Sequence, residues 1–167
     1  MAPVAVFVGA PGAGKTTIGS SVAAILGVPF ADSDEIIEGT AGKPIPEIFF
    51  DDGEDAFRAL ELAAIAAALA DFDGILALGG GAILNEDTRA LLASQTVVYL
   101  SVELADAVKR VGLGGGRPLL AINPRATLKY LLDQRRPLYA SVATHTVATD
   151  GREPEEIAAE LVALLKA

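Results

Sequence analysis

Short apolar runs recur along the chain, and each ends at glycine or at polar residues. Each run is three to five residues long and contains β-branched side chains. Runs of this length and composition are typical of strands that are buried on both faces of a sheet. The pattern predicts strands at residues 4–8, 28–31, 75–78, 96–100 and 146–148.

Between these runs, apolar residues recur at helical spacing. Ile18, Val22 and Leu26 lie on one stripe that stops at Gly27, a residue typical of a helix C-terminus. The same spacing predicts further helices at residues 54–70, 85–92, 103–111 and 124–139, and from 154 to the end. A helical stretch before residue 50 contains Pro44 and Pro46, and we expect it to be irregular. Residues 32–34 are expected to form a loop.

The alternation of strands and helices predicts an α/β fold with three layers. In such a fold a five-stranded parallel sheet carries helices on both faces, and ligands bind at the carboxyl ends of the strands. A length of 167 residues favours one domain over residues 1–167. The glycine-rich segment 112–123 shows no clear period, so we expect a mobile loop there.

Composition and charge exclude several functional classes. The chain has 22 acidic and 13 basic residues and a net charge of −9, which disfavours nucleic acid as a partner. Apolar runs fall well short of the roughly 20 residues that span a bilayer, and the start lacks signal-peptide features, so we expect a cytoplasmic protein without a membrane partner. Cysteine is absent and histidine occurs once, so thiolate metal sites and Ser-His-Asp catalysis are disfavoured.

A phosphate-binding motif lies between the first predicted strand and the first predicted helix. Residues 9–16, GAPGAGKT, fit the pattern G-x-x-x-x-G-K-[ST]. Backbone N–H groups in such a loop converge on phosphate oxygens, the lysine reaches the β- and γ-phosphates, and the hydroxyl binds Mg²⁺. The motif predicts an ATP site with these residues: Gly12, Ala13, Gly14, Lys15, Thr16 and Thr17.

The remaining acidic residues narrow the choice among nucleotide-binding proteins. The chain lacks the Asn-Lys-x-Asp pattern of guanine recognition, which disfavours a GTPase. The strands at 75–78 and 96–100 are followed by Gly79 and Ser101 instead of an acidic residue, so Asp32 or Asp34 must supply the second ligand for Mg²⁺. Taken singly, the signals stay ambiguous. Two aspartates can be a solvated pair, a helical arginine can be a surface charge, and a glycine triplet can be a plain turn.

In combination, these segments resemble those of shikimate kinases over nearly the whole chain. The resemblance rests on the phosphate loop 9–16, Asp32-x-Asp34, Phe57-Arg58 with Glu61, Gly79-Gly80-Gly81, the RPLL of residues 117–120, and the RRPLY of residues 135–139, which fits R-x-P-L-Y. It implies a P-loop kinase fold and transfer of the ATP γ-phosphate to the 3-hydroxyl of shikimate in aromatic amino-acid synthesis. It further implies Mg²⁺, ATP and shikimate as ligands and a lid at about residues 112–123. We expect a monomer.

The resemblance also implies a role for each matching residue. Asp34 would bind the acceptor hydroxyls and act as base, and Asp32 with Thr16 would bind Mg²⁺. Arg58 and Arg135 would bind the acceptor carboxylate, a use that suits the planar guanidinium fork. Glu61 would orient Arg58. The remaining substrate contacts would be Phe49, Phe57, Gly79, Gly80 and Gly81.

On the nucleotide side, the resemblance places Arg117 of the lid at the transferring phosphoryl group and Arg110 with Pro154 around adenine. The chain between the lid and the RRPLY segment is one residue shorter than the family pattern, so the choice between Arg135 and Arg136 stays open. Two other functions also stay open. One is a kinase of another small acid or polyol such as gluconate, and the other is a nucleotide-binding module without catalytic activity.

Overall fold

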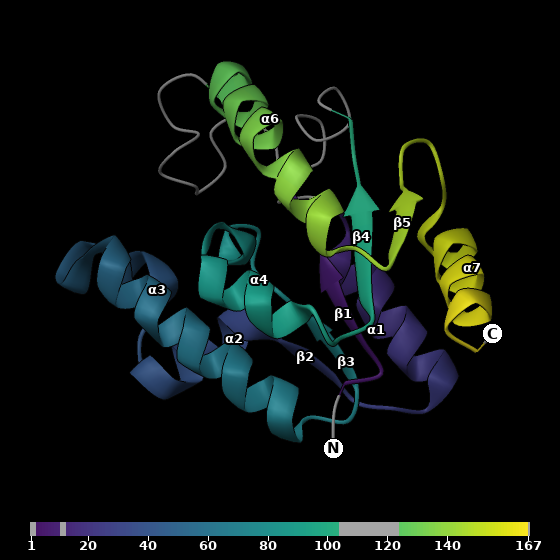
Figure 1. Cartoon of the computed structure of the whole chain (residues 1–167), viewed down its shortest axis with the longest axis horizontal. Helices are drawn as coiled ribbons and strands as arrows, with labels where there is room; N and C mark the ends of the chain where they lie inside the picture. Colours follow the sequence, from purple (N-terminus) through teal and green to yellow (C-terminus); the bar gives the residue numbers. More distant parts are fainter. Residues whose placement is uncertain (1–2, 11–12, 104–123, 167) are drawn as a thin grey trace.

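A computed structural model describes residues 3–10, 13–103 and 124–166. The strands are β1 (Ala5–Val8), β2 (Phe30–Asp32), β3 (Ile75–Ala77), β4 (Val97–Ser101) and β5 (His145–Ala148). The helices are α1 (Lys15–Leu26), α2 (Ser33–Ala41), α3 (Ile45–Asp71), the 3₁₀ helix η1 (Ala82–Leu84), α4 (Glu86–Leu92), α6 (Pro124–Val142) and α7 (Pro154–Lys166). Figure 1 shows the strands side by side in the middle of the molecule.

The five strands form one parallel sheet in the order β2-β3-β1-β4-β5. β1 lies at the centre, where Val6 pairs with Leu76 of β3 on one side and with Val97 of β4 on the other. β2 and β3 therefore lie on one side of β1 and β4 and β5 on the other, and the chain reverses its direction of winding there. Crevices at the carboxyl ends of strands beside such a reversal are the usual ligand sites of parallel α/β sheets.

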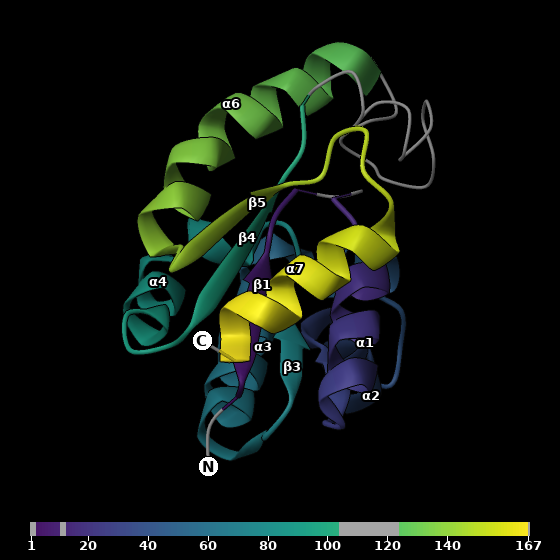
Figure 2. The same cartoon turned by 90° about the vertical axis from the view of Figure 1, so that its right-hand side faces the viewer.

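Helices cover both faces of the sheet, as the sequence predicts. Figure 2 shows α1 and α7 on one side of the strands and α4 and α6 on the other. All four residues of β1 and all three of β3 expose 1% of their surface or less, because their side chains pack under helices on both faces. The predicted three-layer α/β fold with a five-stranded parallel sheet is thereby confirmed.

The start of α2 corrects two expectations about residues 28–34. The second strand is Phe30–Asp32 instead of 28–31, and no loop follows it, because Ser33 already begins α2. The cause is a helix cap: the Asp32 carboxylate accepts the Asp34 N–H at 2.8 Å. A side-chain acceptor at this position satisfies an N–H group that the first turn of a helix leaves unpaired.

The stretch with two prolines is helical, and its prolines mark the beginning of α3. Pro44 is the N-cap and Pro46 lies in the first turn, where proline costs no helical hydrogen bond. The expected irregularity occurs instead at Gly53, whose φ of 87° and ψ of 170° interrupt the helix. The part after Gly53 corresponds to the predicted helix 54–70.

Some expectations fall outside the described part of the chain. The lid predicted at 112–123 lies outside it, and so does all but the first residue of the helix predicted at 103–111. Gly12, Arg110 and Arg117 also lie outside the described residues. Within the described ranges, every helix is too short or too polar to span a bilayer.

Candidate active site

The carboxyl ends of β1, β2 and β3 bring three segments of the predicted site to one edge of the sheet. The phosphate loop follows β1, the Asp32–Asp34 segment follows β2, and the three glycines follow β3. Parallel strands necessarily bring these ends together, although the segments lie at least 16 positions apart in the sequence. The geometry below is therefore set by the topology of the sheet.

The phosphate loop leads directly into α1. Gly14 is the N-cap in a left-handed conformation, and α1 begins at Lys15. The Lys15 ammonium group donates to the carbonyl oxygens of Gly9 at 2.7 Å and Ala10 at 3.1 Å, so its charge is held over the loop. Anionic phosphate is favoured here by the lysine, by backbone N–H groups and by the positive end of the α1 dipole.

Two oxygen ligands lie together where the predicted Mg²⁺ site requires them. The Thr16 hydroxyl donates to Oδ2 of Asp32 at 3.3 Å, while Oδ1 of Asp32 is used by the α2 cap. Mg²⁺ prefers oxygen ligands and usually binds one or two protein groups together with substrate phosphates. A hydroxyl and a carboxylate beside the phosphate loop fit that preference.

Asp34 lies against the first of the three glycines. A Cβ atom on Gly79 would come 2.6 Å from Oδ1 of Asp34, so only glycine leaves room for this carboxylate. The Gly79 N–H donates to the hydroxyl of Ser33 at 3.0 Å, and Ser33 is fully buried. This contact fixes the glycine segment to the start of α2. Ser33 was not among the predicted site residues, because its only signal in the sequence is a small hydroxyl residue between two aspartates.

Arg58 lies against the third glycine and is held by two glutamates. Its Nη1 atom donates to Oε1 of Glu61 at 2.8 Å, and Nη2 lies 3.7 Å from Oε2 of Glu54. A Cβ atom on Gly81 would come 2.6 Å from Nη2 of Arg58. Of the two glutamates, Glu61 is buried at 2% exposure while Glu54 is 64% exposed, so the Glu61 contact is the stronger constraint.

Electrostatic effects on Glu61 show that three charged residues lie near it. Burial raises the pKa of the Glu61 carboxyl above its usual value of 4.5, and the hydrogen bond and charge of Arg58 partly offset that increase. The charge of Asp34 raises the same pKa slightly and that of Arg135 lowers it. Asp34, Arg58 and Arg135 therefore converge on one carboxylate from α2, α3 and α6.

The two neighbouring arginines of α6 occupy different environments. Arg135 is buried at 7% exposure, and its Nε has no hydrogen-bond partner in the described part of the molecule. Arg136 is 37% exposed, lies 3.8 Å from Glu103 and donates to the carbonyl of Val102 at 3.4 Å. An unpaired buried guanidinium nitrogen is costly unless a ligand pairs with it, so Arg135 is the better candidate for binding an anion.

Tyr139, one helical turn after Arg135, reaches the second glycine. Its hydroxyl donates to the carbonyl of Gly80 at 2.5 Å, and its ring stacks on Tyr99 of β4 at a centroid distance of 5.1 Å. Burial raises the pKa of Tyr139 to about 12, and the charge and hydrogen bond of Arg135 act on the same hydroxyl in the opposite direction. The hydroxyl therefore keeps its proton at neutral pH and remains a donor.

The two predicted aromatic residues lie together on α3. The rings of Phe49 and Phe57 are 4.8 Å apart, and the Arg58 guanidinium carbon lies 5.1 Å from the Phe57 centroid. Phe57 is buried at 4% exposure, so it serves the core as well as the site.

On the nucleotide side, Pro154 begins α7, which packs against α1, and Thr17 is exposed in the first turn of α1. Their ATP contacts stay predictions, as do those of Gly12, Arg110 and Arg117.

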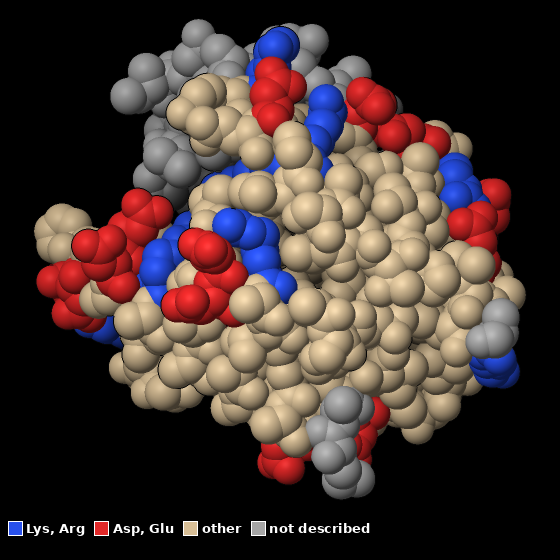
Figure 3. Space-filling view, in the orientation of Figure 1, with Lys and Arg blue, Asp and Glu red and all other residues tan. Residues whose placement is uncertain are grey.

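Basic and acidic side chains lie beside one another on the face that Figure 3 shows: basic side chains near α3 and α4, and acidic side chains over the start of α3. The chain as a whole has a net charge of −9.

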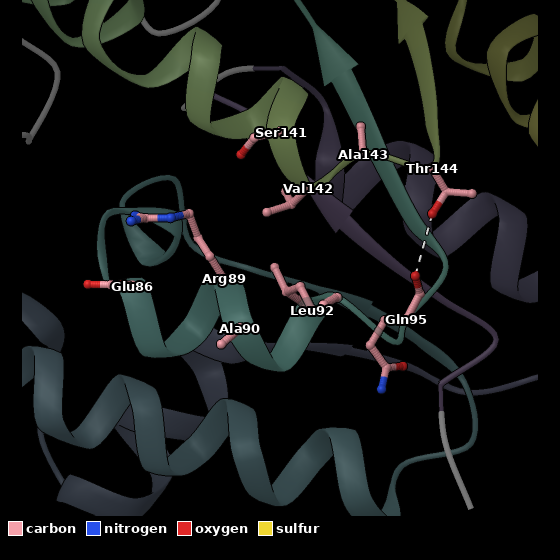
Figure 4. A pocket seen from close by; sticks show the side chains of 10 residues that line it. Glu86, Arg89, Ala90, Leu92, Gln95, Ser141, Val142, Ala143 and Thr144 are labelled. Carbon is pink, nitrogen blue, oxygen red and sulfur yellow. Dashed lines mark hydrogen bonds between the residues drawn. The ribbon is translucent and has the colours of Figure 1, made fainter.

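A hollow elsewhere on the molecule has different properties. It has a volume of about 620 Å³ and lies between α4 and the end of α6 (Figure 4). Its one arginine, Arg89, donates to the carbonyls of Ile83 at 2.7 Å and Leu84 at 3.2 Å and is thus engaged by the protein. The hollow is at the amino ends of β4 and β5, opposite the phosphate loop, and we do not assign it a role in the reaction.

Comparison with known proteins supports the interpretation of this site. The family model described as shikimate kinase matches residues 11–166. The chain belongs to the shikimate kinase family. A shikimate kinase from Salinispora arenicola is 68% identical over 100% of both chains, and one from Salinispora tropica is 68% identical over 99% of both.

A solved member of the shikimate kinase family shares the fold closely. The shikimate kinase from Acinetobacter baumannii, solved in complex with shikimate, is similar with a TM-score of 0.93 and 36% identity, over 99% of this chain and 93% of that one. The predicted family membership and enzyme class are therefore confirmed: the chain is an ATP-dependent kinase. The roles of individual residues are proposals, which follow.

Proposed function

We propose that the chain transfers the γ-phosphate of ATP to the 3-hydroxyl of shikimate, forming shikimate 3-phosphate in aromatic amino-acid synthesis. The observation that carries this assignment is the group formed by Asp34, Arg58, Glu61 and Arg135, in which the buried Nε of Arg135 has no hydrogen-bond partner among the described residues. The group lies at the same edge of the sheet as the phosphate loop. An acid that also carries hydroxyl groups matches both the arginines and the aspartate.

Arg58 and Arg135 would bind the carboxylate of shikimate. Each guanidinium offers donors in a planar fork that matches a carboxylate, and pairs of this kind are among the stronger hydrogen bonds in proteins. Glu61 holds Arg58 through the 2.8 Å contact, so the arginine is oriented before the ligand arrives. Phe49 and Phe57 would line the face of the ring.

Asp34 would accept the proton of the attacking hydroxyl. In the reaction the 3-hydroxyl oxygen forms a bond to the γ-phosphorus, its proton passes to the Asp34 carboxylate, and the bond between the γ-phosphorus and the bridging oxygen breaks to release ADP. Gly79 lets the carboxylate approach this point, because a side chain there would clash with it. Lys15 would leave its loop carbonyls and stabilise charge on the β- and γ-phosphates.

Thr16 and Asp32 would hold Mg²⁺ through their hydroxyl and carboxylate oxygens. When bound, the ion supplies positive charge to the phosphate oxygens during transfer. Asp32 is suited to this role by position, because its second oxygen is fixed by the α2 cap. We further propose that residues 1–167 work as one domain and that the protein is a monomer.

The proposal is tested by measuring ADP release with ATP and Mg²⁺ and a panel of acceptors. We expect turnover with shikimate and only background release with gluconate or without an acceptor. Release with gluconate alone would favour a kinase of another small acid. Tight ATP binding without transfer to any acceptor would favour a nucleotide-binding module instead.

A further inference from the structure

Two of the three glycines after β3 form hydrogen bonds with buried hydroxyl groups from distant parts of the chain. Ser33, at the start of α2, accepts the Gly79 N–H at 3.0 Å, and Tyr139, in the last part of α6, donates to the Gly80 carbonyl at 2.5 Å. Both residues are nearly inaccessible, with exposures of 0% and 1%. Neither hydroxyl belongs to the proposed catalytic set, and hydroxyl groups this deeply buried are costly unless they are paired.

The contact at Gly80 sets the direction of the next N–H group. A trans peptide is planar, so the carbonyl of Gly80 and the N–H of Gly81 point in opposite directions. With the carbonyl held by Tyr139, the Gly81 N–H must point away from α6. No acceptor for this N–H is found within the described residues, and Gly81 lies beside the Arg58 guanidinium. The N–H is thus available to a ligand bound by Arg58.

The same tyrosine is also close to Arg135. Arg135 lies one helical turn before Tyr139 on α6, and its charge acts on the Tyr139 hydroxyl. The ring itself has little freedom, because it is buried and stacked on Tyr99 of β4.

We propose that Tyr139 and Ser33 are positioning residues for the acceptor: Tyr139 orients the Gly80–Gly81 peptide, and Ser33 fixes Gly79. The inference rests on the proposed function, because it takes shikimate as the ligand that the glycines and Arg135 meet. Neither residue touches the reacting atoms. Their hydroxyls act by keeping the binding groups in place before the acceptor arrives, which lowers the cost of binding.

The test is removal of the Tyr139 hydroxyl in the whole chain by Tyr139→Phe, which keeps the ring and its stacking. We expect the KM for shikimate to rise about 10-fold, because the buried Gly80 carbonyl loses its partner and the Gly80–Gly81 peptide is no longer held in one orientation. The KM for ATP should change by less than about twofold, and the melting temperature by only a few degrees. Tyr99→Phe, which removes a hydroxyl from the other ring of the same stacked pair, is the matched control and should leave both KM values unchanged.

Ser33→Ala provides a second variant, because it frees only the Gly79 N–H. We expect it to raise the KM for shikimate and not that for ATP, whereas Ser141→Ala, at an exposed serine of α6, should raise neither. An unchanged KM for shikimate in Tyr139→Phe would overturn the positioning role. Equal increases in both KM values, or a large loss of thermal stability, would show a purely structural role and would also overturn it.

The parent protein separates this inference from the proposed function. If the parent does not phosphorylate shikimate, the proposed function itself fails. If the parent phosphorylates shikimate and Tyr139→Phe behaves like the parent, only the positioning role fails.

Discussion

Replacing Glu61 by glutamine removes a buried negative charge without changing the shape of the side chain. The amide oxygen can still accept from Arg58 at the position where Oε1 now lies, 2.8 Å from Nη1. Arg58 stays charged, so a charged hydrogen bond is kept, and what is lost is the attraction between guanidinium and carboxylate, roughly 1 kcal/mol for a pair that is partly exposed. If this loss appears in acceptor binding, the KM for shikimate rises about fivefold.

Stability should respond to Glu61→Gln in a different way. The pKa of Glu61 is raised in the folded protein, mainly by burial, so the folded state binds this proton more tightly than the unfolded state. The unfolding free energy of the parent therefore includes a favourable contribution that is fully present below the usual pKa of 4.5 and is lost as the pH rises through the folded value. The glutamine variant does not titrate, so its unfolding free energy should lack this decrease with rising pH. At neutral pH it should be about as stable as the parent.

Steady-state kinetics with varied shikimate and thermal melts between about pH 4 and pH 7 measure both effects. Glu54→Gln is the matched control, because Glu54 approaches the same arginine but is 64% exposed and contributes little. An unchanged KM for shikimate in Glu61→Gln would refute the idea that Glu61 orients Arg58. A fivefold increase in Glu54→Gln as well would show that the burial of Glu61 is irrelevant.

Three further substitutions test other parts of the site. Lys15→Ala should lower kcat by about 100-fold or more, because it removes charge from the phosphates, and near-normal turnover would contradict the phosphate-loop assignment. Asp34→Asn should leave the melting temperature unchanged and lower kcat by about 100-fold, as expected for loss of a general base; a small effect would demote Asp34 to a binding role. Gly81→Ala should displace Arg58 and raise the KM for shikimate about 10-fold or more with little loss of stability, whereas Gly39→Ala, whose added methyl meets nothing within 4 Å, should have no effect.

Sequence patterns predicted the sheet and most helices because strands buried on both faces leave a clear apolar signal. They failed at residues 32–34, where a local contact decided the outcome. The cap between the Asp32 carboxylate and the Asp34 N–H starts a helix where polar composition suggested a loop. Periodicity cannot detect a single side-chain cap. The prediction of an irregular stretch from Pro44 and Pro46 was wrong, because proline is tolerated in the first turn of a helix.

The residues of the site also differ in whether the sequence could predict them. The phosphate loop, with Lys15 and Thr16, was predictable from its motif, because each position has a fixed chemical role. The contacts of Ser33 and Tyr139 with the glycines join residues separated by 46 and 59 positions, and no local pattern encodes pairings over that distance. The choice between Arg135 and Arg136 likewise depended on which face of α6 is buried.

The direct test of the account compares kcat/KM for shikimate in the parent, Arg135→Ala and Arg136→Ala, with ATP saturating. Arg135 is buried, and its Nε has no hydrogen-bond partner in the part of the chain that the structure describes, whereas Arg136 is 37% exposed beside Glu103. Loss of one charged hydrogen bond of about 1.5 to 3 kcal/mol predicts a decrease of roughly 10- to 150-fold for Arg135→Ala, and a decrease of less than about threefold for Arg136→Ala. A parent protein that does not turn over shikimate, or a selective defect in Arg136→Ala, would contradict the account.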